Sequence, residues 1–418
     1  MKVLILGSGA KAHALAWALD NSHLITGLYV APGNSGTADI AENIDSIDPN
    51  NPSEVVALCT SLSIDYCLVA TSRAQYNGMV EALMKAGINT LGASTEAAQL
   101  EHDRLNARSF MKRYGIPTTD VEVFSDLKKF EEYLNQHRDE HLVLKRNHPF
   151  STLNVFDSTD YEKLRSFGEE ILEEDSLLVE KFENGYNLSI SVIMDGKNYI
   201  ILPPASDYTK ALDNDTGAIT NGMGAICPVP ILSEKTYSKI LTEIIEPTLE
   251  GLQKENLAYK GVFFFSLLIQ GEGAKLTSYH VKFGNPEAQV ILPLIKSDFG
   301  NLLRAVENEN LNQFNLELST KSAVGVVIAG EGYPERQPRS EIVSIDSVYP
   351  ERKTLLFHGS THKNGDGRIY TDGGRCFTVV GLGENIVKAN SHAYEGIKRV
   401  NFNGAWSRKD IGNKFFEE

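Results

Sequence analysis

The sequence has few cysteines and no long apolar run. Its four cysteines are Cys59, Cys67, Cys227 and Cys376; they form no CxxC pair, and no secretory signal is evident. We therefore expect reduced thiols in the cytoplasm rather than a disulfide framework. No apolar stretch approaches the ~20 residues of a membrane-spanning helix, so we expect no such helix. Internal repeats and low-complexity segments are also lacking, which argues against a solenoid.

The sequence has fewer basic than acidic residues. Lysine and arginine number 40 against 55 aspartates and glutamates, a net charge of -15. This balance argues against a nucleic-acid-binding or anionic-membrane surface, although an acidic protein can still contain a basic pocket. The chain has 418 residues, more than the ~250 to 300 at which single cores stop growing, so we expect two to four domains.

Strand and helix signals alternate over the first hundred residues. A short apolar strand, 1–6, leads through Gly7 and Gly9 into a helical pattern, and further strands are expected at 28–31, 66–70 and 90–91. Helices are expected near 53–61 and 78–87. This alternation predicts a doubly wound parallel sheet. The Gly7 to Gly9 turn either binds an anion at a helix N-terminus or serves only as a tight turn; both interpretations stay open.

The middle of the chain contains the strongest strand signal. An apolar run at 262–269, a glycine turn at 271–273 and a second strand at 275–283 predict a buried hairpin. The break at 284–286 is expected to place Glu287 and Gln289 on a loop at the end of the hairpin. Scaffolds present working residues on such loops, so we expect chemistry there.

The end of this hairpin resembles a known family. Residues 278–287 read S-Y-H-V-K-F-G-N-P-E, similar to the metal-binding segment E-F-N-V-R-F-G-D-P-E of glycinamide ribonucleotide synthetase (phosphoribosylamine-glycine ligase), an ATP-grasp enzyme. The glutamate and asparagine that hold magnesium in the family fall on Ser278 and His280. Magnesium prefers oxygen ligands, so we assign no metal ligands. His280 is either a ligand of a softer ion or a hydrogen-bonded strand residue.

Other segments extend the resemblance from Met1 to about Gly412. Y-V-A-P-G-N-S-G-T-A at 29–38 and the glycine-rich segment 202–228 both match the family wording, as do motifs after residue 323. The resemblance implies α/β and α+β architecture. It consists of a doubly wound N-terminal (pre-ATP-grasp) domain at 1–102, an ATP-grasp region at 103–320 with a covering subdomain near 120–190, and a C-terminal α/β domain at 321–418.

Two loops depart from the family wording. Where the family has a glycine-rich phosphate flap, this chain reads K-R-N-H-P-F-S-T-L-N-V from Lys145. Backbone amides cradle phosphate where side chains do not intervene, so we predict that 147–153 is no phosphate flap. In the loop that grips the ribose phosphate, the glutamate is replaced. Arg73 there either meets a phosphate or is simply solvated.

The resemblance implies a set of site residues. The catalytic residues it implies are Lys210, Asp213, Asp215, Asn285 and Glu287. The residues it implies for the cofactor ATP are Arg104, Lys145, Glu180, Lys181 and Phe182. Those it implies for the substrates are Gly9, Asn34, Gly36, Thr216, Gly217, Gly222, Met223 and Gly224.

By the same resemblance, the cofactors are ATP and Mg²⁺ and the partners are glycine and phosphoribosylamine. Glycine's carboxylate would take the γ-phosphoryl group, and the amine would attack the acyl phosphate. We expect no nucleic-acid or membrane partner, a cytoplasmic location, and a monomer or weak homo-oligomer. Three functions remain open: a divergent ligase, a catalytically degenerate binding or regulatory homologue, and a ligase with a changed substrate.

Overall fold

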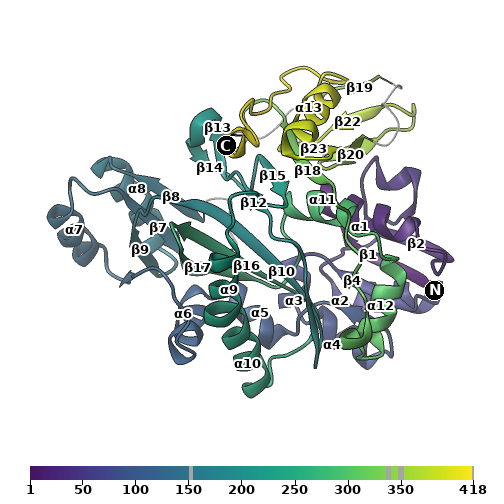
Figure 1. Ribbon diagram of the computed structural model, residues 1–418, viewed down its shortest axis with the longest axis horizontal. Coiled ribbons are helices and arrows are strands. Elements are labelled where there is room, and N and C mark those ends of the chain that lie inside the picture. The colour runs from purple at the N-terminus through teal and green to yellow at the C-terminus, as the bar shows by residue number, and fades with distance from the viewer. Residues whose placement is uncertain (150–153, 336–339, 347–352, 417–418) are drawn as a thin grey trace.

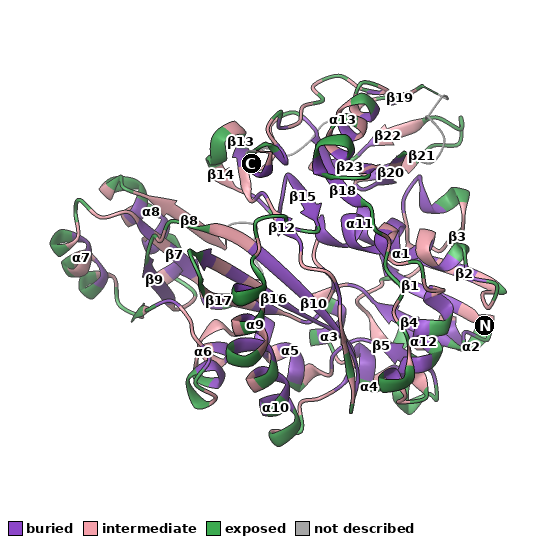
Figure 2. Cartoon of the chain, in the orientation of Figure 1, coloured by how far each residue is buried: buried purple, intermediate pink, exposed green. Residues whose placement is uncertain are grey.

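The computed structural model describes residues 1–149, 154–335, 340–346 and 353–416. Figure 1 shows an N-terminal α/β unit, a central pair of antiparallel sheets and a C-terminal unit that lies above the junction of the other two. The interiors of the three units are formed by buried strands, which are purple in Figure 2. This architecture confirms the predicted fold class.

The N-terminal sheet is parallel, with strand order β3-β2-β1-β4-β5. Its strands are β1 (Lys2–Gly7), β2 (Gly27–Pro32), β3 (Glu42–Asn43), β4 (Tyr66–Val69) and β5 (Asn89–Leu91). The helices between them are α1 (Ala10–Asp20), α2 (Pro52–Leu62), α3 (Ser72–Tyr76) and α4 (Met79–Lys85).

Helices cover this sheet on both faces. Val3 and Ile5 of β1 share a core cluster with α1 side chains, whereas Leu4 and Leu6 share another cluster with α2 and α4. Successive side chains of a strand point to opposite faces, so a continuous apolar strand requires cover on each side. The alternation predicted from the sequence is confirmed.

Two helices lead into a four-stranded antiparallel sheet of order β6-β9-β7-β8. The helices are α5 (Thr95–His102) and α6 (Arg104–Arg113). The strands are β6 (Glu122–Phe124), β7 (Leu142–Arg146), β8 (Val155–Ser158) and β9 (Leu177–Lys181), with α7 (Leu127–Gln136) and α8 (Tyr161–Leu172) between them. Apolar side chains of α7 and α8 form one core with β7 and β9.

A second antiparallel sheet has the order β11-β10-β16-β17. Its strands are β10 (Tyr186–Asp195), β11 (Tyr199–Ile201), β16 (Lys260–Gln270) and β17 (Gly273–His280). The helical segment formed by α9 (Glu234–Ile240), a π-turn (Leu241–Ile245) and α10 (Glu246–Lys254) packs on this sheet. The predicted buried hairpin is therefore confirmed as β16 and β17.

The third sheet joins two distant parts of the chain. It has the order β12-β15-β18-β23-β20. Its strands are β12 (Ser206–Asp207), β15 (Gly224–Cys227), β18 (Ser322–Ala329), β20 (Thr354–His358) and β23 (Arg375–Gly383). β12 and β15 come from the glycine-rich segment 202–228, so both ends of that segment are fixed in a sheet completed by C-terminal strands.

Short elements complete the third unit and its connections. The small strand pairs are β13 (Lys210–Leu212) with β14 (Thr216–Ile219), β19 (Ser344–Ile345) with β24 (Val400–Asn401), and β21 (Thr361–Lys363) with β22 (Ile369–Thr371). The remaining α-helices are α11 (Glu287–Ile291), α12 (Phe299–Glu307) and α13 (Ile386–Ile397).

One expectation about the hairpin's exit is wrong. Glu287 and Gln289 do not lie on an open loop, because α11 begins at Glu287 directly after Pro286 and both side chains are buried. The apolar residues that follow pull this short helix into the core shared with α1. The four cysteines are free and buried. No helix in the described ranges has the length and apolar character needed to cross a membrane.

Candidate functional site

The three units meet around Asn285. A Cβ placed at Gly9 would lie 3.9 Å from Asn285 Nδ2, and one at Gly222 would lie 2.5 Å from Pro286 Cδ. Arg375 Nη1 donates to the Asn285 carbonyl at 2.7 Å and to the Gly222 carbonyl at 3.1 Å. We call this place the three-domain junction. It brings together Gly9, Gly222 and Asn285, three residues that the sequence assigned to the site.

The junction contains charged groups with few partners. Burial and the nearby Asp207 carboxylate raise the pKa of Glu287 to about 8, and burial raises the pKa of Asp207 to about 6. Burial and Lys282 lower the pKa of Lys11 to about 7. Glu287 forms no ion pair with any residue that the structure describes. Uncompensated buried groups of this kind mark ligand sites more often than structural ones.

Gln289 adds an unsatisfied acceptor to the same place. Its Nε2 donates to Asn285 Oδ1 at 2.6 Å, but its Oε1 is buried and has no partner in the described part of the chain. Lys11 Nζ donates to the Phe283 carbonyl at 3.0 Å. An unsatisfied buried acceptor beside a buried ammonium is suited to a small ligand that carries both donor and acceptor groups.

Other predicted substrate residues serve as packing around the junction. Met223 is fully buried, and a Cβ at Gly224 would lie 2.8 Å from the Gly325 carbonyl. Asn34 Nδ2 donates to the carbonyls of Ser8 (2.9 Å) and His358 (2.8 Å). A Cβ at Gly36 would lie 2.2 Å from His13 Cε1. Asn34 and Gly36 join the N-terminal loop to β20, whereas Met223 and Gly224 pack against β18. Contact of these four residues with substrate remains a prediction.

A second cluster lies between β7, β9 and α6. Lys145 Nζ donates to both carboxylate oxygens of Glu180, each at 2.8 Å. Arg108 Nη2 donates to the same carboxylate at 2.6 Å. Burial lowers the pKa of Lys145, while Lys145 and Arg108 outweigh the effect of burial and lower the pKa of Glu180. Two predicted nucleotide residues, Lys145 and Glu180, therefore form one buried ion pair.

Arg104 is a third basic side chain of this cluster, beside Lys145 and Arg108. Its Nε donates to the Arg146 carbonyl at 2.8 Å, and it forms no ion pair among the described residues. Burial lowers its pKa. The two remaining nucleotide residues lie at the end of β9 and directly after it: Lys181 Nζ is 2.9 Å from Glu140 Oε2, and the Phe182 ring stacks on His141 at 4.0 Å. The cluster can thus accept an anion at Arg104.

The structure describes only part of the loop 147–153, which was predicted not to be a phosphate flap. Residues 150–153 lie outside the described ranges. Before them, Asn147 Oδ1 accepts from the Leu105 amide at 2.9 Å, and His148 Nδ1 is 2.9 Å from Asp175 Oδ1. These two side chains bind protein groups, and the prediction for the whole loop stays a prediction.

The position of the family's metal ligands contains a chain of hydrogen bonds. Ser278 Oγ lies 3.1 Å from His280 Nε2, and His280 Nδ1 lies 3.5 Å from Glu101 Oε1. Lys282 Nζ also binds Glu101 Oε1, and the Val281 amide donates to Glu101 Oε2 at 2.9 Å. Lys282 and His280 outweigh burial and hold the pKa of Glu101 well below its usual range. Burial lowers the pKa of His280.

This donor set does not fit Mg²⁺. The ion prefers several carboxylate, carbonyl or water oxygens in octahedral geometry. Here the Glu101 carboxylate is already bound by Lys282, and the neighbours Ser278 and His280 offer a neutral hydroxyl and a nitrogen. No group of three acidic, histidine or cysteine side chains in the described ranges could hold a metal ion.

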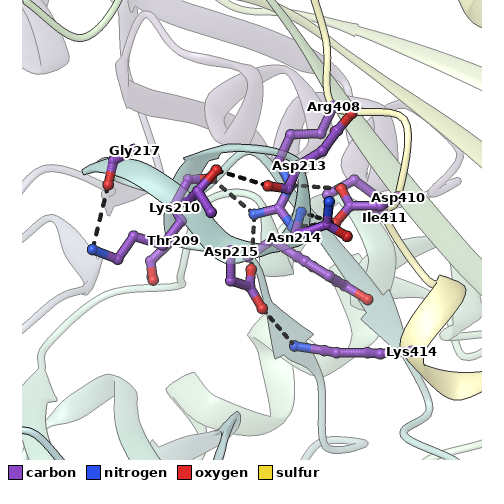
Figure 3. Close-up of polar contacts among 12 residues, drawn as sticks. Thr209, Lys210, Asp213, Asn214, Asp215, Gly217, Arg408, Asp410, Ile411 and Lys414 are labelled. Carbon is purple, nitrogen blue, oxygen red and sulfur yellow. Dashed lines mark hydrogen bonds and ion pairs between the residues drawn. The ribbon is translucent and has the colours of Figure 1, made fainter.

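The predicted catalytic loop lies against the C-terminal segment (Figure 3). The Arg408 guanidinium is fully buried and binds Asp215 Oδ1 at 2.9 Å and Asp410 Oδ2 at 2.7 Å. Asp213 Oδ1 accepts from the Lys409 amide at 2.8 Å. Lys210 Nζ binds Asp157 of β8. The carboxylates are thus occupied, and a catalytic role for Lys210, Asp213 and Asp215 remains a prediction.

Thr216 and Gly217 are the first residues of β14 and follow the turn at Asp213–Asp215 beside this cluster. Thr216 Oγ1 donates to the Asp213 carbonyl at 2.9 Å, and Gly217 has a φ of +80°, a left-handed conformation that glycine adopts without strain. Both residues are exposed. The sequence did not assign Glu101, Arg375 or Arg408 to any site. In the structure, Arg375 lies at the junction, Glu101 beside Ser278 and His280, and Arg408 beside Asp213 and Asp215.

Comparisons with known proteins agree along the whole chain. Models of the phosphoribosylglycinamide synthetase N domain, ATP-grasp (A) domain and C domain match residues 1–101, 103–288 and 323–414. The phosphoribosylamine-glycine ligase of Neisseria meningitidis serogroup B is 32% identical over 423 aligned residues, covering 99% of each chain. The enzyme of that name from Agrobacterium fabrum is 34% identical, covering 99% of this chain and 98% of its own.

Solved structures give the same result for the fold. The phosphoribosylamine-glycine ligase of Thermotoga maritima superposes with a TM-score of 0.83 at 29% identity, covering 98% of this chain and 100% of its own. A biotin carboxylase domain from Hydrogenobacter thermophilus superposes with a TM-score of 0.72 at 14% identity, covering 97% of this chain and 91% of its own. The second likeness concerns the fold alone.

Proposed function

This chain belongs to the phosphoribosylglycinamide synthetase family of ATP-grasp proteins, and we propose that it binds that family's small molecules and an adenine nucleotide in purine biosynthesis without efficient magnesium-dependent ligation. The observation that carries the proposal is a contrast between two clusters. The three-domain junction keeps groups suited to glycine and an amine, whereas the position of the metal ligands binds protein cations instead of Mg²⁺. Relatives can share a fold and differ in activity, so the proposal rests on the residues of the site and not on the fold alone.

The junction residues supply recognition and proton transfer in this proposal. The Arg375 guanidinium, bound only to carbonyl groups among the described residues, attracts the carboxylate of glycine. Lys11, with a pKa lowered to about 7, holds or accepts the proton that an attacking amine must lose. Glu287, with a pKa raised to about 8, offers the amine a neutral hydrogen-bonding group.

Arg104 and Lys145 would hold the nucleotide phosphates. A bound nucleotide supplies the phosphoryl group that activates a carboxylate as an acyl phosphate. Lys145 is bound to Glu180 in this structure, so it faces the phosphates only if it leaves that carboxylate. No step is assigned to Mg²⁺, because the donor set does not fit the ion.

The test separates binding from turnover. Calorimetry should detect glycine binding to the full chain, and Arg375→Met should abolish it, because the carboxylate of glycine loses the guanidinium that the junction presents to it. Lys275→Gln, a change on β17 that removes a half-buried ion pair with Glu183, serves as the control and should bind glycine normally. Formation of glycinamide ribonucleotide from glycine, phosphoribosylamine and Mg-ATP should be slow. Rapid product formation would overturn the proposal.

A ligase with a changed metal requirement is the second candidate. The retained junction favours it, because groups with perturbed pKa values are expected where proton transfer occurs. Product formation that persists in excess EDTA would favour this candidate over a protein that only binds its ligands.

A further inference from the structure

Among the described residues, basic side chains outnumber the buried acidic ones in the region between the two antiparallel sheets, which we call the cleft. Arg104, Arg108, Lys145 and Lys282 surround two buried glutamates, Glu101 and Glu180. A third acidic side chain, Asp175, is only 8% exposed and is already bound to His148. In a magnesium-dependent cleft the protein must present oxygens to the ion. This cleft presents ammonium and guanidinium groups.

Both glutamates are saturated by protein donors. Glu101 accepts from the Ser72 hydroxyl at 3.0 Å and the Val281 amide at 2.9 Å, besides its contact with Lys282. Glu180 accepts from the Thr119 hydroxyl at 2.8 Å, besides its bonds to Lys145 and Arg108. A divalent cation would have to displace an ammonium group to reach either carboxylate, and that exchange is unfavourable in a buried site.

An anion meets no such obstacle. Arg104 has no acidic partner in the described part of the chain, and its guanidinium has further donors beyond the Nε that binds the Arg146 carbonyl. Lys282 shares Glu101 with His280, so the carboxylate keeps a second partner when the flexible lysine turns toward a ligand. Lys11 and Lys282 also line one small pocket between the N-terminal sheet and β16.

We propose that this cleft binds the phosphates of its nucleotide as a metal-free polyanion, with Arg104 and Lys282 in place of the divalent ion. The proposal rests on the proposed function for the identity of the ligand as a nucleotide. Mg²⁺ in solution lowers the charge of ATP, and it therefore weakens binding to a cleft that supplies its own cations.

Calorimetric titration of the full chain with ATP, in excess EDTA and in excess Mg²⁺, tests the proposal. ATP should bind at least as tightly in EDTA as in Mg²⁺. Arg104→Gln should weaken binding in EDTA by about tenfold, the loss expected when a charged hydrogen bond is removed. Inorganic tripolyphosphate should compete with ATP, because the phosphates carry the recognition. Lys275→Gln is the control with unchanged affinity.

The variant Glu101→Gln distinguishes a site in which protein cations bind the phosphates from a site that holds Mg²⁺, because the two predict opposite changes in nucleotide affinity. The substitution frees Lys282 from a carboxylate, so ATP should bind several-fold more tightly in EDTA. A magnesium site that loses a carboxylate would instead bind Mg-ATP more weakly. The isosteric amide keeps the contacts to Val281 and Ser72, and an unchanged melting temperature would show that the fold is preserved.

Each other result overturns the proposal. Binding that requires Mg²⁺ contradicts it but leaves the proposed function intact. Absence of ATP binding in both solutions contradicts the proposed function as well. Binding in EDTA that is indifferent to both Arg104→Gln and Glu101→Gln means that the phosphates lie elsewhere.

Discussion

The guanidinium of Arg408 lies 2.9 Å from the carboxylate of Asp215, a residue 193 positions earlier in the chain. The arginine side chain is fully buried, and a second carboxylate, Asp410, binds its other terminal nitrogen. The hairpin that carries Asp213 and Asp215 is therefore attached to the C-terminal segment by a buried cation. The position of this hairpin depends on the last residues of the chain.

Arg408→Met should destabilise the protein by about 3 kcal/mol, because the change removes the charged hydrogen bonds of a fully buried guanidinium to Asp215, Asp410 and the Lys210 carbonyl. Asp215→Asn should be milder, since that side chain is half exposed and exposed partners contribute about 1 kcal/mol or less. Denaturant unfolding measures both. A larger effect for Asp215→Asn would mean that Arg408 does not hold the hairpin.

Restoring the family residues at the metal position should create magnesium binding. Ser278→Glu and His280→Asn together should improve Mg-ATP affinity by more than the sum of the single changes, because both ligands serve one ion. Calorimetry on the unmodified chain, both single variants and the double variant gives the coupling free energy. Purely additive effects would show that the two positions do not share an ion.

Acid should destabilise the contact between the N-terminal unit and β20. Burial lowers the pKa of His13 to about 3 and that of His358 to about 4, so the unfolded chain binds protons from pH 6.5 downward while the folded chain does not. Between pH 6.5 and about 4, stability should fall by about 1.4 kcal/mol per group for each pH unit.

His358→Asn isolates this effect. Asparagine cannot be protonated in this range, so the stability of the variant should depend less on pH. The slope of the free energy of unfolding against pH should fall by the contribution of one histidine. Denaturant unfolding at a series of pH values gives both slopes. Parallel curves for the variant and the unmodified chain would exclude His358 as the source.

Glu287→Gln should stabilise the protein at neutral and alkaline pH. Burial and Asp207 raise the pKa of Glu287 to about 8, so the folded carboxyl keeps its proton while the unfolded one, with a pKa of 4.5, is ionised. Stability contributed by this group is full below pH 4.5 and is lost as pH rises through about 8. The amide imitates the protonated state and removes the loss.

The same Glu287→Gln variant should bind glycine more weakly, since the group faces the junction. The variant should gain about 1 kcal/mol or more in the free energy of unfolding and should lose affinity for glycine. Such a gain in stability at the cost of function is common when a destabilising group of a binding site is replaced. If the variant were less stable than the unmodified chain at pH 8, Glu287 would not be a buried carboxyl without a compensating charge.

The fold was largely predictable because local signals agreed with one another. The strands expected at 1–6 and 66–70 are observed as β1 (Lys2–Gly7) and β4 (Tyr66–Val69), because each is a short apolar run. Glu287 was wrongly expected on an open loop because Pro286 in the sequence signals the end of a strand. That signal does not reveal that the short apolar sequence behind it is pulled into a core built by α1.

The site was less predictable because its key contacts join distant residues. Glu101 binds Lys282 across 181 positions, and Arg375 binds Asn285 across 90. An arginine in a sequence is usually solvated, and nothing local distinguishes Arg375 or Arg408 from such a residue. The replaced ligands at Ser278 and His280 were visible in the sequence, but the cations that occupy their surroundings were not.

The sheet that combines β12 and β15 with β18, β23 and β20 limits how this protein can be shortened. A fragment that ends before Ser322 would retain Gly224–Cys227 but lack β18, the partner of that strand. The buried strand would become an open edge with unpaired amide and carbonyl groups, which recruit strands from other molecules. Such a fragment should aggregate on expression, whereas removal of the covering subdomain's outer helices would leave this edge protected.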